Sequence, residues 1–370
     1  MIDSDDDYNI FFSDTSSDTS DDNELDDLLV HERPKNEGYF EDTVPQYGPE
    51  FMEHFRLNRH VVESLAENYS QSGIFKRHSG MYGKLSALQQ THIYLWFVGH
   101  QTASFRDVAD RFNISISSLF RIIKRLTEYV SNLAPQTIYW PTAQERNVIE
   151  RDFRQNGFPG VIGAIDGSHI KIDIPAVDPD SYLNRKGYHS IQMQVVCDSK
   201  KKIRDLFVGY PGSVHDSRVF RVSPLSETLE EKCQNMYILG DSGYPLLPNL
   251  LTPFRDRGQL TRRQINYNRK LSKNRYIVEH CFGLLKQKFR QLYHVKLRKI
   301  VNIVHLIRAC CVLHNMSLED NFDVNVEEIH HDNNVQHDML PANHNLEDED
   351  VEENVNGRIV RNNVVNMLQM

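Results

Sequence analysis

GVIGAID at residues 160–166 is the first of four short runs that decide the fold of this chain. The other three are IQMQVVCD (191–198), IRDLFVGY (203–210) and MYILGD (236–241). Each is rich in β-branched or aromatic residues and is bounded by Gly, Pro, Asp or Lys, which is typical of β-strands. The segment CDSKKKI between the second and third runs predicts a hairpin turn.

Downstream of these runs, the pattern continues with a short strand and a long helix. LLTPF (250–254) predicts the strand, and a helical pattern extends from about Asn268 to Gln291. Helical sequence also separates the third and fourth runs. The chain therefore predicts an α/β fold, a mixed sheet flanked by helices with antiparallel hairpins at its start.

Upstream of the strands, the apolar residues recur at helical spacing. FMEHFRLNRHVVESLAENY (51–69) and SALQQTHIYLWFVGHQ (86–101) each predict a helix. TASFRDVADRFNISISSLFRIIKRLTEYV (102–130) has two helical runs divided by a polar turn, with Ser104 capping the first and Ser115 or Ser117 the second. This is the pattern of a helix-turn-helix, whose outer face would present Arg121, Lys124 and Arg125 to DNA. An ordinary three-helix unit with a solvated basic face is the alternative.

The charge of the chain is divided between its ends and its middle. Residues 1–30 hold eleven acidic residues and no Lys or Arg, and residues 318–354 hold thirteen and none. Because the whole chain carries −9 and two arginines lie beyond residue 354, residues 31–317 carry +13. A cationic body favours a nucleic-acid binder, whereas acidic runs of this composition are usually disordered.

Membrane and secreted classes are not expected. No window approaches ~18 consecutive apolar residues, and the amino terminus lacks the layout of a secretory signal. The five cysteines form no CxxC pair, so we expect reduced core thiols in an intracellular protein.

Four acidic residues occupy positions where a sheet edge or a helix would place them together. Asp166 ends the first strand run, Asp241 ends the fourth, and Asp216 lies where a helix should begin after the third. Each of these could instead be a turn former or a helix cap. Glu279 lies among apolar residues of the long helix, so it needs a neutralising partner. That partner is either a salt bridge to Arg275 or Lys286, or a divalent cation shared with the aspartates.

Carboxylate oxygens without cysteine partners suit Mg²⁺ or Mn²⁺ rather than zinc. Such ions, in pairs ~3.5–4 Å apart, support in-line displacement at a phosphate. GxSxG, Walker, HExxH and Rossmann motifs do not occur in the sequence. His215 beside Asp216 is similar to the His-Asp pair of metal phosphohydrolases, although a dipeptide is weak evidence.

These residues lie in stretches that resemble the PIF/Harbinger transposases and the Harbinger transposase-derived nucleases of the DDE superfamily. The similar stretches are VIGAIDGSHIKI (161–172), YLNRKGYHSIQMQVVCD (182–198), YPGSVHDSRVF (210–220), ILGDSGYPL (238–246) and RYIVEHCFGLLKQKF (275–289). Similarity extends upstream through FMEHFRLNRHVVESL (51–65) and FRDVADRFNISISSLFRIIKRL (105–126), so it covers roughly residues 50–317.

The resemblance implies a ribonuclease H-like fold and a divalent-metal site of Asp166, Asp216, Asp241 and Glu279, with Asp166, Asp241 and Glu279 as the catalytic acids. It also implies residence in the nucleus, with the cytoplasm as a second compartment, and a Myb-like accessory protein. Together with the composition of the two ends, the predicted organisation is a disordered acidic N-terminus (1–45), a helical region with the helix-turn-helix (46–150), the ribonuclease H-like DDE nuclease domain (151–317) and a disordered acidic tail (318–370).

A basic segment supports DNA as the partner independently of the resemblance. FRDRGQLTRRQINYNRKLSKNR (254–275) holds eight Arg or Lys residues against the single acid Asp256, and phosphate contacts of this kind give affinity without sequence choice. The alternative is a solvated helix face. Asn184, Arg185 and Lys186 are a smaller second candidate. Within the basic segment, the predicted DNA contacts are Arg262, Arg263, Arg269 and Lys270.

The sequence therefore predicts a metal-dependent DNA endonuclease or transposase. A transposase-derived protein that binds DNA but no longer cuts it is the second hypothesis, against which the intact acids argue. A pure helix-turn-helix repressor would leave residues 160–317 unexplained.

Overall fold

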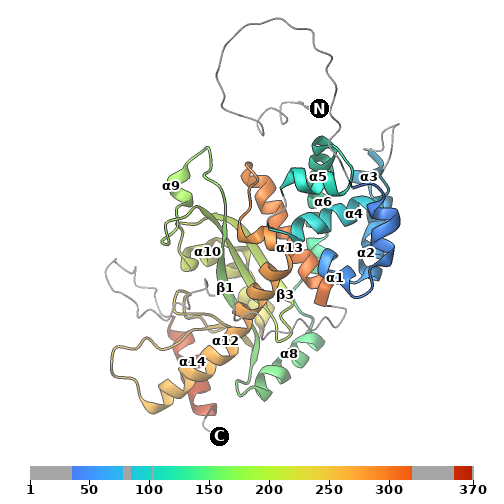
Figure 1. Ribbon diagram of the computed structural model, residues 1–370. Coiled ribbons are helices and arrows are strands. Elements are labelled where there is room, and N and C mark those ends of the chain that lie inside the picture. The colour runs from blue at the N-terminus through green and yellow to red at the C-terminus, as the bar shows by residue number, and fades with distance from the viewer. Residues whose placement is uncertain (1–35, 78–84, 102–103, 319–353, 369–370) are drawn as a thin grey trace, which may run out of the picture. The chain divides into compact units, whose positions relative to one another are not determined.

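The structure is a computed structural model that describes residues 36–77, 85–101, 104–318 and 354–368. Its centre is a five-stranded mixed sheet with the strand order β3-β2-β1-β4-β5 (Figure 1). The first three strands form an antiparallel meander, and β4 and β5 continue the sheet parallel to β1. The predicted mixed sheet with antiparallel hairpins at its start is confirmed. The strands are β1 (Val161–Lys171), β2 (Ser190–Cys197), β3 (Ile203–Pro211), β4 (Tyr237–Leu239) and β5 (Leu250–Leu251).

The hairpin turn between β2 and β3 is built by one aspartate. The Asp198 carboxylate accepts the backbone N–H groups of Lys200 (2.8 Å) and Lys202 (3.0 Å), and Lys201 adopts the left-handed conformation. The predicted hairpin at CDSKKKI is therefore confirmed. The strand predicted over 250–254 is shorter, because Pro253 lacks the N–H that would continue the ladder.

Helices flank the sheet. The long helix α12 packs against β1, β2 and β4, α8 packs against β1, and α13 packs against β3. A capping box between Thr261 and Gln264 starts α12 six residues earlier than the predicted start at Asn268. The helices of this part are α8 (Ala143–Gln155), α9 (Pro179–Tyr182), α10 (Asp216–Val222), α11 (Pro224–Cys233), α12 (Arg262–Lys288), the 3₁₀ turn η4 (Arg290–Tyr293) and α13 (Ile300–Leu318).

The helical region upstream shares one hydrophobic core with the sheet. Ser104 and Ser115 cap α5 and α6 as predicted, and the turn between these helices places Asn113 in the left-handed conformation. Helix α6 packs along α13, and the Ser131 hydroxyl hydrogen-bonds His305 Nδ1 at 2.9 Å. The helices are α1 (Glu50–Phe55), α2 (Arg59–Gln71), α3 (Gly73–Arg77), α4 (Ala87–Gly99), α5 (Phe105–Arg111), α6 (Ile116–Asn132) and α7 (Ala134–Thr137).

Two segments predicted to be disordered contain regular structure. Within residues 1–45, the π-helix η2 (Tyr39–Thr43) and the 3₁₀ turn η3 (Val44–Gln46) begin the described chain, and the buried Tyr39 packs edge-on against Phe112. Within residues 318–370, Val355–Met367 forms α14, which packs beside α12 and β5 (Figure 1). Both predictions are wrong there, because a few apolar side chains find partners in the distant core. Residues 1–35, 319–353 and 369–370 of these segments lie outside the described residues.

Helix α13 has the length and apolar composition of a membrane span, although its packing accounts for that composition. It lies between α6 and β3, and most of its side chains are buried inside the molecule. A helix in the interior of a folded domain needs apolar residues on most of its faces. The five cysteines are all buried and free, which confirms the predicted core thiols.

Candidate active site

Asp166 and Asp241 come from two strands that pair directly in parallel. The sequence predicts that Asp241 ends its strand, whereas β4 ends at Leu239 and Asp241 lies two residues further on. We also expected Asp166 to end its strand. Instead, it lies within β1, opposite Val195. The strand continues to Lys171 because β2 pairs with it over that whole length. The two aspartates nevertheless meet, since both lie beyond the stretch where β1 pairs with β4.

Asp216 is the first residue of α10, and its side chain is directed toward the sheet. It does not cap its own helix, where the N-cap position belongs to His215 and no side-chain cap is made. Its Oδ1 accepts a short hydrogen bond from the amide of Gln192 on β2. A Cβ added to Gly167 would collide with the same oxygen, so glycine at this position leaves the space that the Asp216 carboxylate occupies.

Three aspartates lie near enough to one another for their charges to interact. Burial, and then the nearby charge of Asp241, raises the pKa of Asp166 to about 7. Burial and Asp241 likewise raise the pKa of Asp216 to about 6, against the lowering effects of Gln192 and Arg185. Like charges disfavour ionisation only at close range in a poorly solvated site. We name Asp166, Asp216 and Asp241 the acid cluster.

Glu279 reaches the same region from α12, through an arginine. Arg275 Nη2 donates to Glu279 Oε1 at 2.5 Å, and its Nη1 donates to Asp166 Oδ2 at 2.9 Å. The salt bridge that the sequence left open is therefore made with Arg275. Lys286 instead donates to the hydroxyl of Ser168. One guanidinium thus lies between Asp166 and Glu279, where the sequence analysis placed a divalent cation.

The carboxylates at this site are ligands of the type that a hard divalent cation prefers. In this structure, the guanidinium of Arg275 takes the place of such a cation. Carboxylates with raised pKa values are favourable ligands for Mg²⁺ or Mn²⁺, which would take over their neutralisation. Gln192 Oε1, buried next to Asp216, has no hydrogen-bond partner in the described structure. However, among the described residues no group of three His, Cys, Asp or Glu side chains is disposed to hold a metal ion. A cation would therefore have to displace Arg275 from at least one carboxylate.

Sequence reasoning missed two residues at this site. Gln192 gave a signal in the sequence, because it is a polar residue within the strand run 191–198. The structure buries every residue of this strand, and only 2% of the Gln192 surface is exposed. Tyr244, in the loop after β4, is also 2% exposed, and its hydroxyl has no hydrogen-bond partner among the described residues. It is within electrostatic reach of all three aspartates. A tyrosine in a loop carries no such signal.

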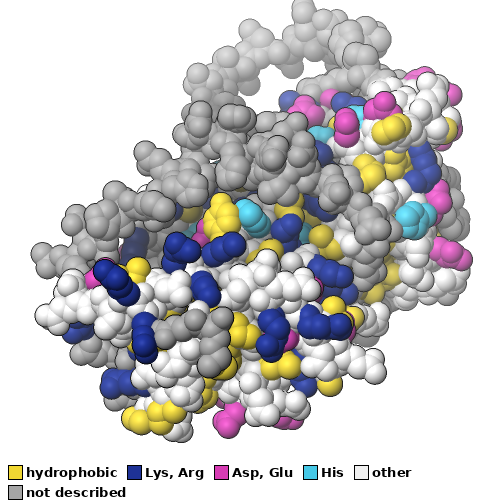
Figure 2. Space-filling model, turned by 90° about the horizontal axis from the view of Figure 1, so that it is seen from below, with side chains coloured by type: hydrophobic (Ala, Val, Ile, Leu, Met, Phe, Trp, Pro, Cys, Tyr) yellow, Lys and Arg dark blue, Asp and Glu magenta, His cyan; other side chains and the backbone are white. Residues whose placement is uncertain are grey.

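The predicted DNA-contacting residues lie on two helices. Arg121 and Lys124 of α6 are exposed, whereas Arg125 is half-buried. On α12, Arg262, Arg263 and Arg269 are exposed, and Lys270 donates to the carbonyl oxygen of Leu368 at 3.1 Å. Lys and Arg side chains also gather on the face of the molecule drawn in Figure 2.

Comparison with known proteins places the acids in one domain. Residues 165–315 match the model of the DDE superfamily endonucleases. Over 223 residues the chain is 35% identical to "Putative nuclease HARBI1" of Rattus norvegicus and 33% identical to its namesake in Homo sapiens. It is 29% identical over 233 residues to "Protein ALP1-like" of Arabidopsis thaliana.

These matches cover part of each protein. They span 59% of this chain and 63% of the rat and human proteins, and 57% of this chain and 56% of the Arabidopsis protein. No solved structure matches the chain. All four acids lie inside the residues matched by the endonuclease model. Residues 165–315 are therefore similar to DDE superfamily endonucleases, and over this part of the chain its relatives include proteins named as putative nucleases.

Proposed function

We propose that this protein is a divalent-metal-dependent endonuclease that cleaves DNA phosphodiester bonds, as a transposase or a domesticated relative. The observation that carries the proposal is the convergence of Asp166, Asp216 and Asp241, two of which have raised pKa values. A buried cluster of like charges is costly to maintain, and such clusters are typical of functional sites. The strand order β3-β2-β1-β4-β5 supports the ribonuclease H-like arrangement that the resemblance implies.

Each residue has a distinct task in this proposal. Asp166, Asp216, Asp241 and Glu279 would hold Mg²⁺ or Mn²⁺, which when bound polarises the phosphate and activates the attacking water or hydroxyl. The amide of Gln192 orients the Asp216 carboxylate. Arg275 pairs with Asp166 and Glu279, and its guanidinium would be able to stabilise charge that develops on the phosphate if a cation took its place between these carboxylates.

The substrate and its handling follow from the basic surfaces. Arg262, Arg263, Arg269 and Lys270 are proposed to contact the DNA backbone, and Arg121, Lys124 and Arg125 the DNA at a helix-turn-helix made by α5 and α6. Backbone contacts of this kind position the duplex without reading its sequence. Sequence recognition by a Myb-like accessory protein and residence in the nucleus are parts of the same proposal.

Cleavage of supercoiled plasmid DNA in Mg²⁺ or Mn²⁺ tests the proposal. Asp241→Asn and Glu279→Gln should each lower the nicking rate by more than about 100-fold, because each removes a proposed metal ligand. Asp180→Asn and Glu231→Gln are matched controls, since both residues are exposed outside the acid cluster. Nicking that survives Asp241→Asn would refute the assignment.

One observation favours a second candidate, a DNA-binding protein that does not cut. Arg275 already neutralises Asp166 and Glu279, so these acids are satisfied without a metal. That protein would bind DNA equally well in EDTA and in Mn²⁺. It would nick no plasmid under either condition.

A further inference from the structure

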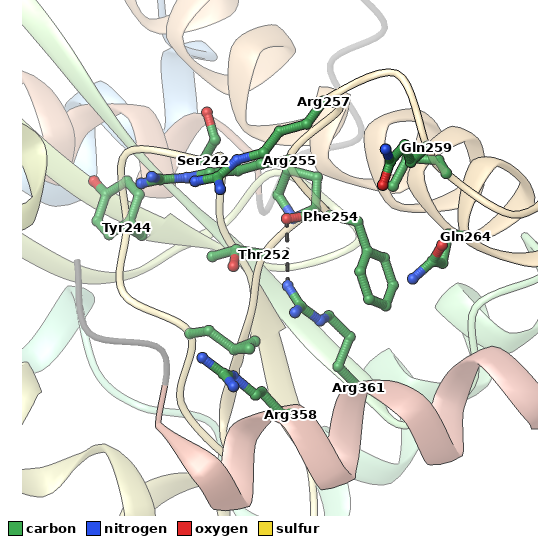
Figure 3. A pocket seen from close by; sticks show the side chains of 13 residues that line it. Ser242, Tyr244, Thr252, Phe254, Arg255, Arg257, Gln259, Gln264, Arg358 and Arg361 are labelled. Carbon is green, nitrogen blue, oxygen red and sulfur yellow. Dashed lines mark hydrogen bonds between the residues drawn. The ribbon is translucent and has the colours of Figure 1, made fainter. Parts of the chain in front are cut away.

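A pocket of about 510 Å³ opens beside the acid cluster. Its walls come from the loop that follows Asp241, the segment 252–260 and α14. Arg255 and Arg257 reach over it from one side, and Arg358 and Arg361 rise from α14 on the other (Figure 3). We name this site the arginine pocket. The sequence predicts disorder where α14 lies, so this wall of the pocket could not be foreseen.

The charge of the arginine pocket is of one sign. Four of its thirteen lining residues are arginines and none is acidic. The nearest acid in the segment is Asp256, which is exposed and accepts a backbone N–H of its own loop at 2.8 Å. Four like charges around one hollow repel one another, and an anion inside it relieves that repulsion. The planar fork of arginine matches phosphate oxygens in pairs, which a lysine does not.

The α14 wall is fixed in place by packing. The guanidinium of Arg361 lies 4.0 Å from the ring centre of Phe254 and donates to the carbonyl oxygen of Pro253 at 3.4 Å. Backbone approach is equally close, because a Cβ on Gly357 would lie 3.0 Å from the carbonyl oxygen of Leu246. At the far end, Lys270 donates to the carbonyl oxygen of Leu368. The helix is thus held against the domain in the position that completes the pocket.

We propose that the arginine pocket binds a backbone phosphate, with its sugar, of the DNA strand that lies next to the scissile bond. Its volume exceeds the needs of a bare phosphate and falls within the range of about 300–1,000 Å³ usual for ligand pockets. Its position supports a neighbouring nucleotide, since Ser242 lines it and directly follows Asp241. The inference deepens the proposed function and rests on it for the identity of the substrate.

Tyr244 joins the two regions. It lines the arginine pocket, and its buried hydroxyl has no hydrogen-bond partner among the described residues. Burial keeps the pKa of this phenol well above its usual range, so it remains a neutral donor. The side chain of Tyr244 lines the pocket, whereas its hydroxyl is buried, so a phosphate oxygen would reach this donor only after the side chain shifts.

Binding of a short fluorescein-labelled DNA duplex to the full chain, in EDTA and over a series of salt concentrations, tests the inference. Arg255→Gln/Arg257→Gln should weaken binding at least about tenfold and make the slope of log affinity against log salt shallower by about one, because the pocket contacts one phosphate. Arg358→Gln should change the slope by about one. Both variants alter exposed residues only, so folding is preserved. The matched control is Arg151→Gln/Lys200→Gln, which removes the same charge from exposed sites outside the pocket.

A double-mutant cycle separates a shared phosphate from a general basic surface. If Arg257 and Arg358 hold one phosphate, combining Arg257→Gln with Arg358→Gln should cost less affinity than the sum of the single changes. Additive losses, or slopes equal to those of the control, would overturn the inference. So would a variant that loses binding to polyglutamate but keeps binding to DNA, since the pocket would then serve an acidic protein.

The outcome is independent of cleavage, because EDTA removes the metal. If the wild-type protein nicks no DNA in Mn²⁺ and the pocket variants still lose DNA affinity, the proposed nuclease function fails and the pocket stands. If nicking is normal and the slopes are unchanged, the pocket fails and the nuclease stands.

Discussion

The acid cluster and the arginine pocket differ in the sign of their charges and in how the repulsion between those charges is compensated. Both gather like charges, and Tyr244 lies between them. The acid cluster is neutralised in part from within, because Arg275 pairs with Asp166 and, outside the cluster, with Glu279. None of the described residues that line the arginine pocket is acidic. The first site must therefore exchange an internal cation to bind a metal, whereas the second presents cationic side chains to an anion.

The largest expected effect comes from replacing Arg275, the internal cation of the acid cluster. Arg275→Met should lower the free energy of unfolding by about 3 kcal/mol at neutral pH, because it leaves a buried carboxylate without its partner. Urea unfolding in EDTA measures the loss. Arg269→Gln is the control, since this exposed arginine lies on the same helix.

The same variant also tests whether Arg275 and the metal compete. Mn²⁺ should raise the melting temperature of Arg275→Met more than that of the wild-type protein, because the cation then replaces the missing guanidinium. An equal or smaller rise in the variant would mean that Arg275 does not occupy the cation position.

A smaller effect on the free energy of unfolding is expected from a change of pH, which titrates the acid cluster but not the arginines. The raised pKa values mean that, between about pH 4 and pH 7, the folded protein binds more protons at Asp166 and Asp216 than the unfolded chain does. The contribution of these two carboxyls to stability in EDTA should therefore fall by a few kcal/mol, on the order of 3, between about pH 4 and pH 7. The histidines His92, His100 and His169, whose pKa values burial lowers to about 4, act in the opposite direction. The fall is therefore taken as the difference between the wild-type protein and Asp166→Asn/Asp216→Asn. Urea unfolding along a pH series measures the fall.

Asp216→Asn isolates one part of this pH dependence. It should remove the portion of the fall that lies below about pH 6, because the Asp216 carboxyl titrates there in the folded state. Asp180→Asn should leave the profile as in the wild-type protein. A profile in Asp216→Asn that matches the wild type would show that this carboxyl is not buried against like charges.

Much of this architecture was predictable, because local patterns set it. The β-branched runs fixed three of the strands closely, and Ser104 and Ser115 cap helices where the sequence placed them. The i,i+4 spacing of Arg275 and Glu279 already allowed their salt bridge. The second partner of Arg275, Asp166, lies 109 residues away along the chain, and no local pattern reports such a contact.

Long-range pairing also explains the errors. Asp166 lies within its strand because β2 continues the ladder past it, which the run GVIGAID does not reveal. Helix α14 follows a long acidic stretch, and its apolar face is too short to hold a helix alone. It is stable because Gly357 and Arg361 fit against Leu246 and Phe254. Residue composition therefore could not predict α14 or the pocket that it completes.

The smallest expected effect concerns Tyr244, which lies between the acid cluster and the arginine pocket. Tyr244→Phe removes a buried hydroxyl that has no partner among the described residues, so the free energy of unfolding should stay the same or rise by up to about 1 kcal/mol. If that hydroxyl donates to a phosphate in the arginine pocket, DNA affinity in EDTA should fall about threefold to tenfold in the same variant. A protein of equal or greater stability that binds DNA more weakly would assign Tyr244 to the ligand. Unchanged affinity would confine Tyr244 to packing beside the acid cluster.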